Sequence, residues 1–390
     1  MKDVYFLDIY EEHRSGFTTY KEELFACFNG YKNIRLHLLV ENYPTDEFRI
    51  KKVNGMECFY IPRLSPIYYR KNILGTLLKQ YIKDSSNSIF LINFSPTYQT
   101  ALMLKEYFPL SKVIYVIHDF IWASFLLGDI DRFKRIITGA ETHEKKDIIY
   151  KAYEDNIKSF QLVDNIVCLS EDTFDLLSSF YHVESSKLTI IHNGMRDKYE
   201  CDKVLKKNSS SITLLAVGRI TRQKGMIDLI LSFERVSNSF PDSQLVIAGK
   251  IEKDTENVLR NHLNDKIHIL GDISHKELYE WYQIADIGIV ASYYEQCSYV
   301  GIEMKMFGLP IVASNSFGVK NMFNENNARM IAIEGKSSEE ILCNIANSII
   351  KILEMPMNQR KELARNSRKS YETMYNINHM ENNYINLINQ

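Results

Sequence analysis

Short runs of β-branched and aromatic residues alternate with longer helical patterns along the first half of the chain. The strand-like runs are residues 4–9, 34–40, 89–94, 113–117 and 166–169. Because helical stretches separate most of them, the pattern predicts parallel βαβ units. One segment breaks this rhythm, since Asn54-Gly55 lies between two strand-like pieces of residues 48–61. That dipeptide predicts a β-hairpin, inserted as a ribbon.

A polar, lysine-rich stretch, residues 196–211, separates this half from a second one in which the alternation starts again. The expected strands are 212–217, 245–248, 267–270, 287–290 and 311–313, and the expected helices are 256–263, 276–284 and 299–307. We therefore predict an α/β protein with two domains, residues 1–195 and 196–369. Residues 370–390 have roughly helical periodicity, weakest at 376–379, and are expected to form a helix that packs back on the first domain.

Length and composition exclude some classes of protein. The chain has 390 residues, 45% hydrophobic and 25% charged, which suits two folded domains. Its 47 basic and 49 acidic residues give a net charge of -2 without long runs of one sign, so a nucleic-acid partner is not expected. The six cysteines are scattered without metal-ligand spacing, which favours a reducing compartment.

Location is inferred from the ends and the apolar stretches of the chain. The N-terminus lacks the features of a signal peptide. The most apolar stretch, residues 113–130, contains His118, Asp119 and Asp129, so no membrane-spanning helix is expected. A cytoplasmic protein is therefore predicted. Residues 70–83 form a basic amphipathic pattern, which either packs one face on its own sheet or rests on anionic lipid at the inner face of a membrane.

A basic loop follows the first strand of the second domain. Gly218-Arg219 and Lys224-Gly225 lie between strand 212–217 and a helical pattern that begins at Met226. Ligands of α/β domains bind at this edge of the sheet, and a helix N-terminus favours anions. Arg219 and Lys224 could hold a pyrophosphate there, with Gly218 allowing close backbone approach. The alternative is an ordinary solvated basic loop.

Two glutamates flank another junction between strand and helix. Glu295 and Glu303 are eight positions apart, which on one helix means about 12 Å of rise and roughly 80° of rotation. They cannot form a close acid/base pair, but they suit opposite ends of one long ligand. Residues 297–300 would begin the helix between the two glutamates, and their backbone N–H groups would face a diphosphate. Two unrelated surface glutamates would give the same spacing.

These motifs, taken in order, resemble the retaining glycosyltransferases of the GT-B fold, in the glycogen-synthase-like and mannosyltransferase-like group. The resemblance rests on Gly218-Arg219 with Lys224-Gly225, on Glu295-x7-Glu303, and on the segments 163–171, 190–194, 271–286 and 308–314. It covers the whole second half and scattered points of the first. The resemblance implies two Rossmann-like domains that face each other across a cleft, with hinges near Asn193-Gly194 and before Ser370.

The resemblance also implies roles for individual residues. Arg219 and Lys224 would neutralise the leaving diphosphate, Glu303 would hold the ribose and Glu295 the donor sugar. His118 would project near the donor sugar, and catalysis would involve His118, Arg219, Lys224 and Glu295. The full donor-binding set would be Gly16, Gly218, Arg219, Lys224, Glu295, Cys297, Ser298, Tyr299, Val300 and Glu303.

The implied reaction moves a sugar from a nucleotide sugar to a glycan, lipid-linked or peptide acceptor. A UDP-sugar is the favoured donor, and a GDP-sugar is the other choice. The anomeric configuration would be retained, by front-face attack, and neither a metal nor a cofactor would be required. The sequence departs from the family at Gln296-Cys297-Ser298 and at Met304-Lys305, and has one glycine, Gly16, where two are common. The shape of the sugar pocket therefore cannot be inferred from the family. The motif from Glu295 to Gly301 resembles a bacterial subgroup.

Other interpretations stay open. Asp129-Ile130-Asp131 matches the metal-binding motif of a different glycosyltransferase fold but does not end a clear strand. A sugar-nucleotide epimerase or a phosphorylase could use a similar architecture. A non-catalytic helper subunit could bind a partner or substrate protein, although such helpers typically lose the cations or the paired glutamates that this chain keeps.

Overall fold

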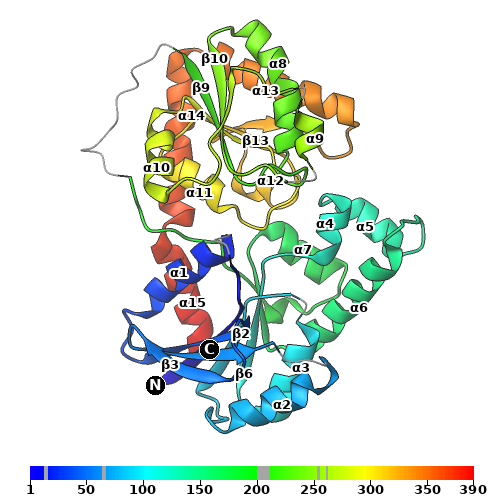
Figure 1. Cartoon of the computed structure of the whole chain (residues 1–390), viewed down its shortest axis with the longest axis vertical. Helices are drawn as coiled ribbons and strands as arrows, with labels where there is room; N and C mark the ends of the chain where they lie inside the picture. The colour runs from blue at the N-terminus through cyan, green and yellow to red at the C-terminus, as the bar shows by residue number, and fades with distance from the viewer. Residues whose placement is uncertain (13–15, 64–66, 96, 200–210, 253–254, 261) are drawn as a thin grey trace. The chain divides into compact units, whose positions relative to one another are not determined.

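The computed structural model describes residues 1–12, 16–63, 67–95, 97–199, 211–252, 255–260 and 262–390, which form two compact units. Unit 1 contains Met1–Trp122, Asp131–Asn193 and Met380–Gln390, and unit 2 contains Ala123–Ile130 and Gly194–His379. Figure 1 shows that each unit is built around its own sheet, with helices packed against it.

The sheet of unit 1 has the strand order β3-β4-β2-β1-β5-β6-β7-β8, and neighbouring strands are parallel except in the β3–β4 pair. The strands are β1 (Lys2–Ile9), β2 (Ile34–Tyr43), β3 (Arg49–Val53), β4 (Met56–Pro62), β5 (Ser88–Ile92), β6 (Lys112–Ile117), β7 (Asn165–Cys168) and β8 (Leu188–Ile190). The helices are α1 (Gly16–Phe28), α2 (Ile67–Lys79), α3 (Tyr98–Tyr107), α4 (Ile121–Leu126), α5 (Ile130–Ile137), α6 (Lys146–Leu162) and α7 (Glu171–Ser179).

The central strands of unit 1 are buried along most of their length. Every residue of β5 is buried, and so are residues 4–8 of β1. Continuous buried runs, without alternation, are typical of a parallel sheet that is covered on both faces. The strands predicted for this half are confirmed, with ends that differ by a few residues.

The predicted hairpin is also confirmed. Asn54 and Gly55 both have positive φ, of 50° and 85°, as a two-residue hairpin turn requires. Strand β4 pairs in parallel with β2, so the hairpin extends the unit 1 sheet and places β3 at its edge. All five residues of β3 are exposed.

Unit 2 contains a fully parallel sheet with the order β11-β10-β9-β12-β13-β14. Its strands are β9 (Ile212–Val217), β10 (Ser243–Ala248), β11 (Ile267–Ile269), β12 (Ile287–Val290), β13 (Ile311–Ser314) and β14 (Arg329–Ile331). Its helices are α8 (Met226–Ser239), α9 (Glu256–Leu259), α10 (His275–Ile284), α11 (Tyr299–Met306), α12 (Val319–Met322), α13 (Ser338–Glu354) and α14 (Met357–Ser370). Counted along the chain, this is the order 3-2-1-4-5-6 of a Rossmann-type sheet. The order reverses between β9 and β12.

Some predicted elements differ from the structure. The strands β8 and β14, of three residues each, were not foreseen. Helix α9 ends at Leu259, four residues before the predicted end. Helix α2 ends at Lys79, because the N–H groups of Gln80 and Tyr81 donate to carbonyls only three residues back.

Helix α2 bears on the expected membrane contact. Its Leu74 and Leu78 are buried, which agrees with the interpretation that one face packs on its own unit, while Ile73 is exposed. No helix within the described ranges is long and apolar enough to cross a bilayer. Contact with a membrane surface remains a prediction.

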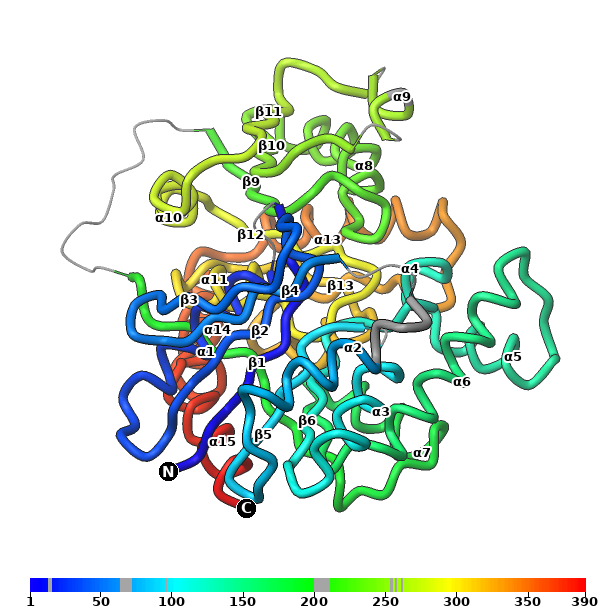
Figure 2. The backbone as a smooth tube through the Cα atoms, turned by 60° about the horizontal axis from the view of Figure 1, so that its bottom comes forward, coloured from blue at the N-terminus to red at the C-terminus, as the bar shows by residue number. Residues whose placement is uncertain are grey.

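The C-terminal segment passes from unit 2 back to unit 1. Helix α14 runs into a π-helical turn, Tyr371–Tyr375, and the helix breaks at Asn376, inside the predicted weak spot. Helix α15 (Ile377–Asn389) then packs on unit 1, where the Tyr384 hydroxyl is hydrogen-bonded to that of Tyr20 and Lys112 donates to the Leu387 carbonyl at 3.0 Å. Figure 2 shows the two chain ends close together in this unit.

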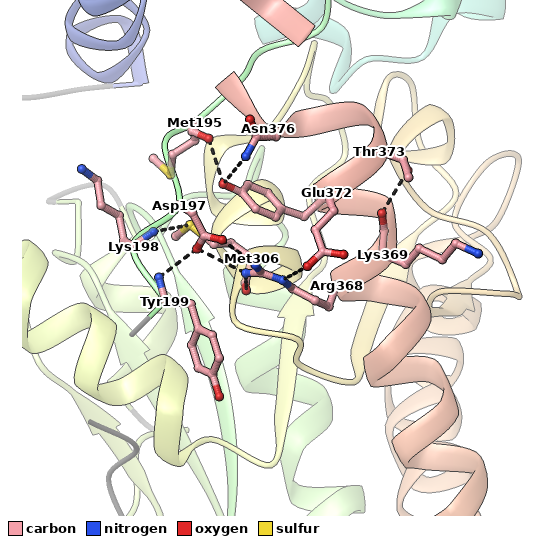
Figure 3. A network of polar contacts seen from close by, with 11 residues as sticks. Met195, Asp197, Lys198, Tyr199, Met306, Arg368, Lys369, Glu372, Thr373 and Asn376 are labelled. Atoms are coloured by element: carbon pink, nitrogen blue, oxygen red, sulfur yellow. Dashed lines mark hydrogen bonds and ion pairs between the residues drawn. The ribbon is translucent and has the colours of Figure 1, made fainter. Parts of the chain in front are cut away.

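A polar network ties the segment that enters unit 2 to the helix that leaves it (Figure 3). Arg368 is paired with Asp197 and donates to the Met306 carbonyl at 2.6 Å and to Glu372 at 2.7 Å. The Tyr371 hydroxyl donates to the Met195 carbonyl at 2.9 Å. These contacts explain why residues 370–379 group with unit 2, whereas the sequence placed 370–390 with the first domain and ended that domain at 195.

Residues 123–130 also group with unit 2, although the sequence assigned them to the first domain. The backbone at Gly128 packs directly against Tyr293 and Tyr294, in the loop between β12 and α11. Side-chain periodicity carries no information about such a contact between backbone segments that are distant in sequence.

Candidate active site

Two loops meet where the strand order of unit 2 reverses. One joins β9 to α8 and the other joins β12 to α11. The Tyr293 N–H donates to the Gln223 carbonyl at 2.8 Å. Gly225 has a φ of +66° and lies so close to Ala291 that a Cβ would be 2.0 Å from its carbonyl oxygen. Backbone contacts therefore fix the two loops against each other.

This arrangement brings Lys224 and Glu295 together. Lys224 Nζ lies 2.6 Å from Glu295 Oε1, and the Ser292 hydroxyl donates to the same oxygen at 2.9 Å. The Lys224 side chain is 34% exposed and that of Glu295 is 14% exposed. The carboxylate is thus held from two sides, while part of the lysine side chain remains accessible to a ligand.

A pocket opens beside this pair, within unit 2. Its walls come from the ends of β9 and β12, from the two loops and from the start of α11; they include Val217, Gly218, Lys224, Met226, Ile289, Val290, Ala291, Ser292, Glu295, Ser298 and Val300. Five of the predicted donor-binding residues, Gly218, Lys224, Glu295, Ser298 and Val300, therefore lie around one pocket. It sits at the switch point of the sheet, where ligands of this architecture bind.

Ser298 caps helix α11 at the pocket. Its side chain accepts a hydrogen bond from the Gly301 N–H at 3.3 Å, and its own N–H donates to the sulfur of Met322 at 3.1 Å. Cys297 is buried and Tyr299 is half-buried, and neither is among the described residues that line the pocket. The N-terminus of α11 is nevertheless at the pocket wall, through Ser298 and Val300.

Arg219 lies differently from the expectation. Its side chain is 74% exposed and its guanidinium is 3.4 Å from the carboxylate of Glu252, and it is not among the described residues that line the pocket. The adjacent Gly218 does line it. Any role for Arg219 in binding a diphosphate therefore requires it to leave Glu252, a weak and solvent-exposed pair.

Glu303 is buried inside unit 2, apart from the described pocket lining. The residue is 4% exposed, and its Oε2 accepts a hydrogen bond from the Tyr282 hydroxyl at 2.8 Å. Burial raises the pKa of Glu303 to about 7, although the hydrogen bond from Tyr282 acts in the opposite direction. Burial likewise lowers the pKa of Lys305, two positions along α11, to about 7.

The raised pKa of Glu303 gives a prediction about stability. Its ordinary value is 4.5, so the unfolded chain releases this proton first and the folded state loses stability as pH rises from about 4.5 to about 7. In Glu303→Gln the amide stays neutral and still accepts from Tyr282. We expect the variant to gain on the order of 3 kcal/mol over the wild type between about pH 5 and about pH 8 in urea denaturation. The exposed Glu280→Gln is the control; equal pH dependence of wild type and Glu303→Gln would contradict this assignment.

The residues predicted in the first domain lie in unit 1. Gly16 begins α1, and His118 follows β6. His118 lines a pocket with residues that follow β1 and β5, and its ring contacts those of Phe17 and Tyr20, with centroids 5.0 Å and 4.5 Å away. Desolvation by these surroundings lowers the pKa of His118 to about 3, so its imidazole is neutral at physiological pH.

Three residues around these sites were not found from the sequence. The Tyr282 hydroxyl donates a hydrogen bond to Glu303, and the Ser292 hydroxyl donates one to Glu295. Asn93 is hydrogen-bonded to His118. Ser292 and Asn93 each follow a buried strand, which is the one signal that could have found them. Tyr282 is on the buried face of α10; it lies in the segment 271–286 that carries the resemblance, but no role was assigned to it. Within the described ranges, no group of three or more His, Cys, Asp or Glu residues is placed to hold a metal ion.

Comparison with known sequences identifies a domain within unit 2. Residues 197–370 match the model of the family described as "Glycosyl transferases group 1". The chain is 25% identical to the glycogen synthase of Mycobacterium tuberculosis strain H37Rv over 159 residues, which cover 40% of this chain and 38% of that protein. The chain therefore matches less than half the length of this relative.

Solved structures match over the whole chain. Sucrose-phosphate synthase of Thermosynechococcus elongatus superposes with a TM-score of 0.76 at 18% identity, covering 100% of this chain and 99% of that one. Anabaena HepE, solved in complex with UDP-glucose, gives a TM-score of 0.70 at 13% identity and covers 100% of both chains. At such identities the likeness shows the fold alone. The predicted GT-B fold, with two Rossmann-like domains, is confirmed.

Proposed function

We propose that the chain is a group 1 glycosyl transferase, an enzyme that transfers a hexose from a nucleotide sugar to an acceptor hydroxyl. The match of residues 197–370 to the model of that family supports this proposal. A UDP-sugar is the favoured donor and a GDP-sugar the other choice. The observation that carries the proposal is the pairing of Lys224 with Glu295, 2.6 Å apart, at the pocket between the two loops of unit 2. A cation at this position suits the diphosphate of a nucleotide sugar, and a carboxylate suits the hydroxyls of its sugar.

The donor would lie along this pocket. Lys224 would release Glu295 in part and bind the diphosphate, together with the N-terminus of α11 at Ser298 and Val300. Glu295 would accept hydrogen bonds from hydroxyls of the donor sugar. Glu303 would hold the ribose through Oε1, since Oε2 already accepts from Tyr282.

The slow event would be cleavage of the bond between sugar and phosphate. Positive charge on the departing diphosphate stabilises that transition state, and a fixed lysine costs no reorganisation when the bond breaks. We propose retention by front-face attack, with the acceptor hydroxyl losing its proton to the leaving phosphate. Lys224 would supply the charge that a metal supplies elsewhere, so the reaction is proposed to require neither a metal nor a cofactor.

The acceptor is proposed to bind unit 1, where His118 lies in a pocket. A glycan, a lipid-linked sugar and a peptide are the acceptor classes carried over from the resemblance. We propose a cytoplasmic location, with α2 as the element that could touch an anionic membrane surface.

Thermal denaturation with nucleotides tests the donor site. In a chelating buffer, UDP at about 100 times its dissociation constant should stabilise the protein by about 2.7 kcal/mol. GDP and ADP are the comparison ligands, and Lys224→Met should lose most of the shift. Absence of a shift with all three nucleotides would refute the proposal and favour a helper subunit. Turnover of the sugar nucleotide without any acceptor into an epimer would instead indicate an epimerase.

A further inference from the structure

Asn93 is a buried polar residue to which neither the sequence motifs nor the proposed mechanism assigns a role. It is 1% exposed and directly follows β5, and its backbone N–H donates to the Leu7 carbonyl of β1 at 3.1 Å. The ends of two central strands therefore fix its main chain. The residue lines the pocket of unit 1, together with His118.

The side chain of Asn93 makes one hydrogen bond within the described part of the chain. Its Oδ1 is bonded to Nε2 of His118, which follows the neighbouring strand β6, while its Nδ2 has no partner there. Burying an amide that leaves its N–H groups unused costs free energy, so the residue contributes little to stability by itself. Its one contact indicates a task that it performs through His118.

This contact fixes the tautomer of His118. An amide oxygen only accepts hydrogen bonds, so Nε2 carries the proton and Nδ1 keeps its lone pair. Phe17 and Tyr20 of α1 contact the same ring edge to face, with interplanar angles of 68° and 75°. The imidazole is therefore held in one orientation as well as in one tautomer.

The same surroundings keep His118 uncharged. Burial alone lowers the pKa of its imidazole to about 3, and the neutral amide of Asn93 does not oppose this effect. Other titratable groups face the ring from α1 or line the same pocket, and each of them has a partner of its own: Tyr20, Asp8, Glu11 and Asp119. Among the described residues, only Asn93 is hydrogen-bonded to the ring.

A neutral imidazole suits the slow step of the proposed reaction. When the bond between sugar and phosphate breaks, its electron pair leaves with the diphosphate and positive charge develops on the sugar. An imidazolium beside that sugar would raise the barrier by repulsion. An uncharged ring avoids this repulsion, and its Nδ1 can accept a hydrogen bond from a sugar hydroxyl.

We propose that Asn93 is a positioning residue for the transfer, which holds His118 as the uncharged Nε2–H tautomer so that Nδ1 accepts from a hydroxyl of the transferred sugar. The inference rests on the proposed glycosyl transfer. Asn93 itself need not touch the substrate, because it acts through the charge and the tautomer of His118. Both properties can be measured separately from stability.

NMR of the full chain with ¹⁵N-labelled histidine measures the state of the ring directly. The signals that disappear in His118→Gln assign it. In the wild type, His118 should be protonated at Nε2 and bare at Nδ1, without titration between about pH 5.5 and about pH 8.5. A ring protonated at Nδ1, or one that titrates in this range, would overturn the proposal.

Asn93→Asp replaces the amide by a carboxylate of the same shape. The carboxylate still accepts from Nε2, but its charge should raise the pKa of His118 toward the ordinary value of 6.5. Hydrolysis of UDP-glucose, UDP-N-acetylglucosamine and GDP-mannose identifies a donor that the wild type uses. With that donor, the ratio of the variant's kcat to that of the wild type should rise at least about tenfold from about pH 5.5 to about pH 8.5, since the imidazolium loses its proton. A merely structural role would leave this ratio independent of pH.

Asn93→Leu covers the case in which a buried carboxylate prevents folding. It removes the acceptor without adding charge, so kcat should fall at least about tenfold at every pH while UDP still binds, and part of His118 should change to the Nδ1–H tautomer. Asn87→Asp is the matched control, at an exposed position before the opposite end of β5. It should leave kcat, its pH profile and the His118 signals unchanged.

The outcomes separate this inference from the proposed function. A wild type that neither binds UDP nor hydrolyses any of the three donors would refute the proposed function, and the role of Asn93 with it, whichever tautomer NMR finds. With an active wild type, a pH-independent ratio in Asn93→Asp or an unchanged kcat in Asn93→Leu would overturn the role of Asn93 alone.

Discussion

Replacement of Lys224 by methionine is expected to lower kcat for sugar transfer by about 100- to 1,000-fold. Methionine has a similar length but no charge, so the diphosphate would lose the cation that is fixed nearest to it. The donor KM should change less than kcat, because charge on the leaving group grows as the bond breaks. Hydrolysis of the sugar nucleotide, followed by mass spectrometry, measures both quantities without knowledge of the acceptor.

A matched control is Lys276→Met on the exposed surface of α10. It removes the same charge from the same unit, away from the pocket, and should leave kcat unchanged. If Lys224→Met retained activity within about threefold of the wild type, the leaving group would be stabilised by other residues. Arg219 would be the first candidate, provided that it leaves Glu252.

The second large effect is expected for Gly318→Ala, which disturbs the position of Glu295. Gly318 has a φ of +73°, and a Cβ there would lie 1.9 Å from the carbonyl oxygen of Glu295. Neither atom belongs to a flexible side chain, so the loop that carries Glu295 must move. We expect a loss of about 3 kcal/mol in the free energy of unfolding together with loss of donor hydrolysis. Urea denaturation and the hydrolysis assay measure the two effects.

Gly335→Ala separates the clash from backbone strain. Gly335 has nearly the same φ, +69°, but nothing lies within 4 Å of its Cβ position. This variant should lose only about 1 kcal/mol and keep its activity. Equal losses in both variants would show that the contact with Glu295 does not matter.

The fold was predictable from local pattern to a large extent. Buried strands such as β1 and β5 appear in the sequence as continuous apolar runs, and Asn54-Gly55 marks its hairpin because both positions require positive φ. The order of the strands was not predictable in the same way, because the sequence of β9 does not indicate that β10 and β12 pair with its two edges.

The candidate site was predictable where residues follow strands and carry charge. Lys224 and Glu295, 71 positions apart, were expected to bind one donor molecule, and the structure pairs them. The sequence could not show that Arg219 would turn to Glu252 or that Tyr282 would hold Glu303, because those contacts depend on side-chain direction. Asn93 was missed because a neutral amide after a strand has no distinctive spacing.

A crystal structure of the full chain with UDP tests the central claim most directly. We expect the diphosphate to lie within hydrogen-bond distance of Lys224 Nζ and the N-terminus of α11, with the ribose hydroxyls at Glu303. A bound UDP whose phosphates touch neither Lys224 nor residues 298–300 would contradict it.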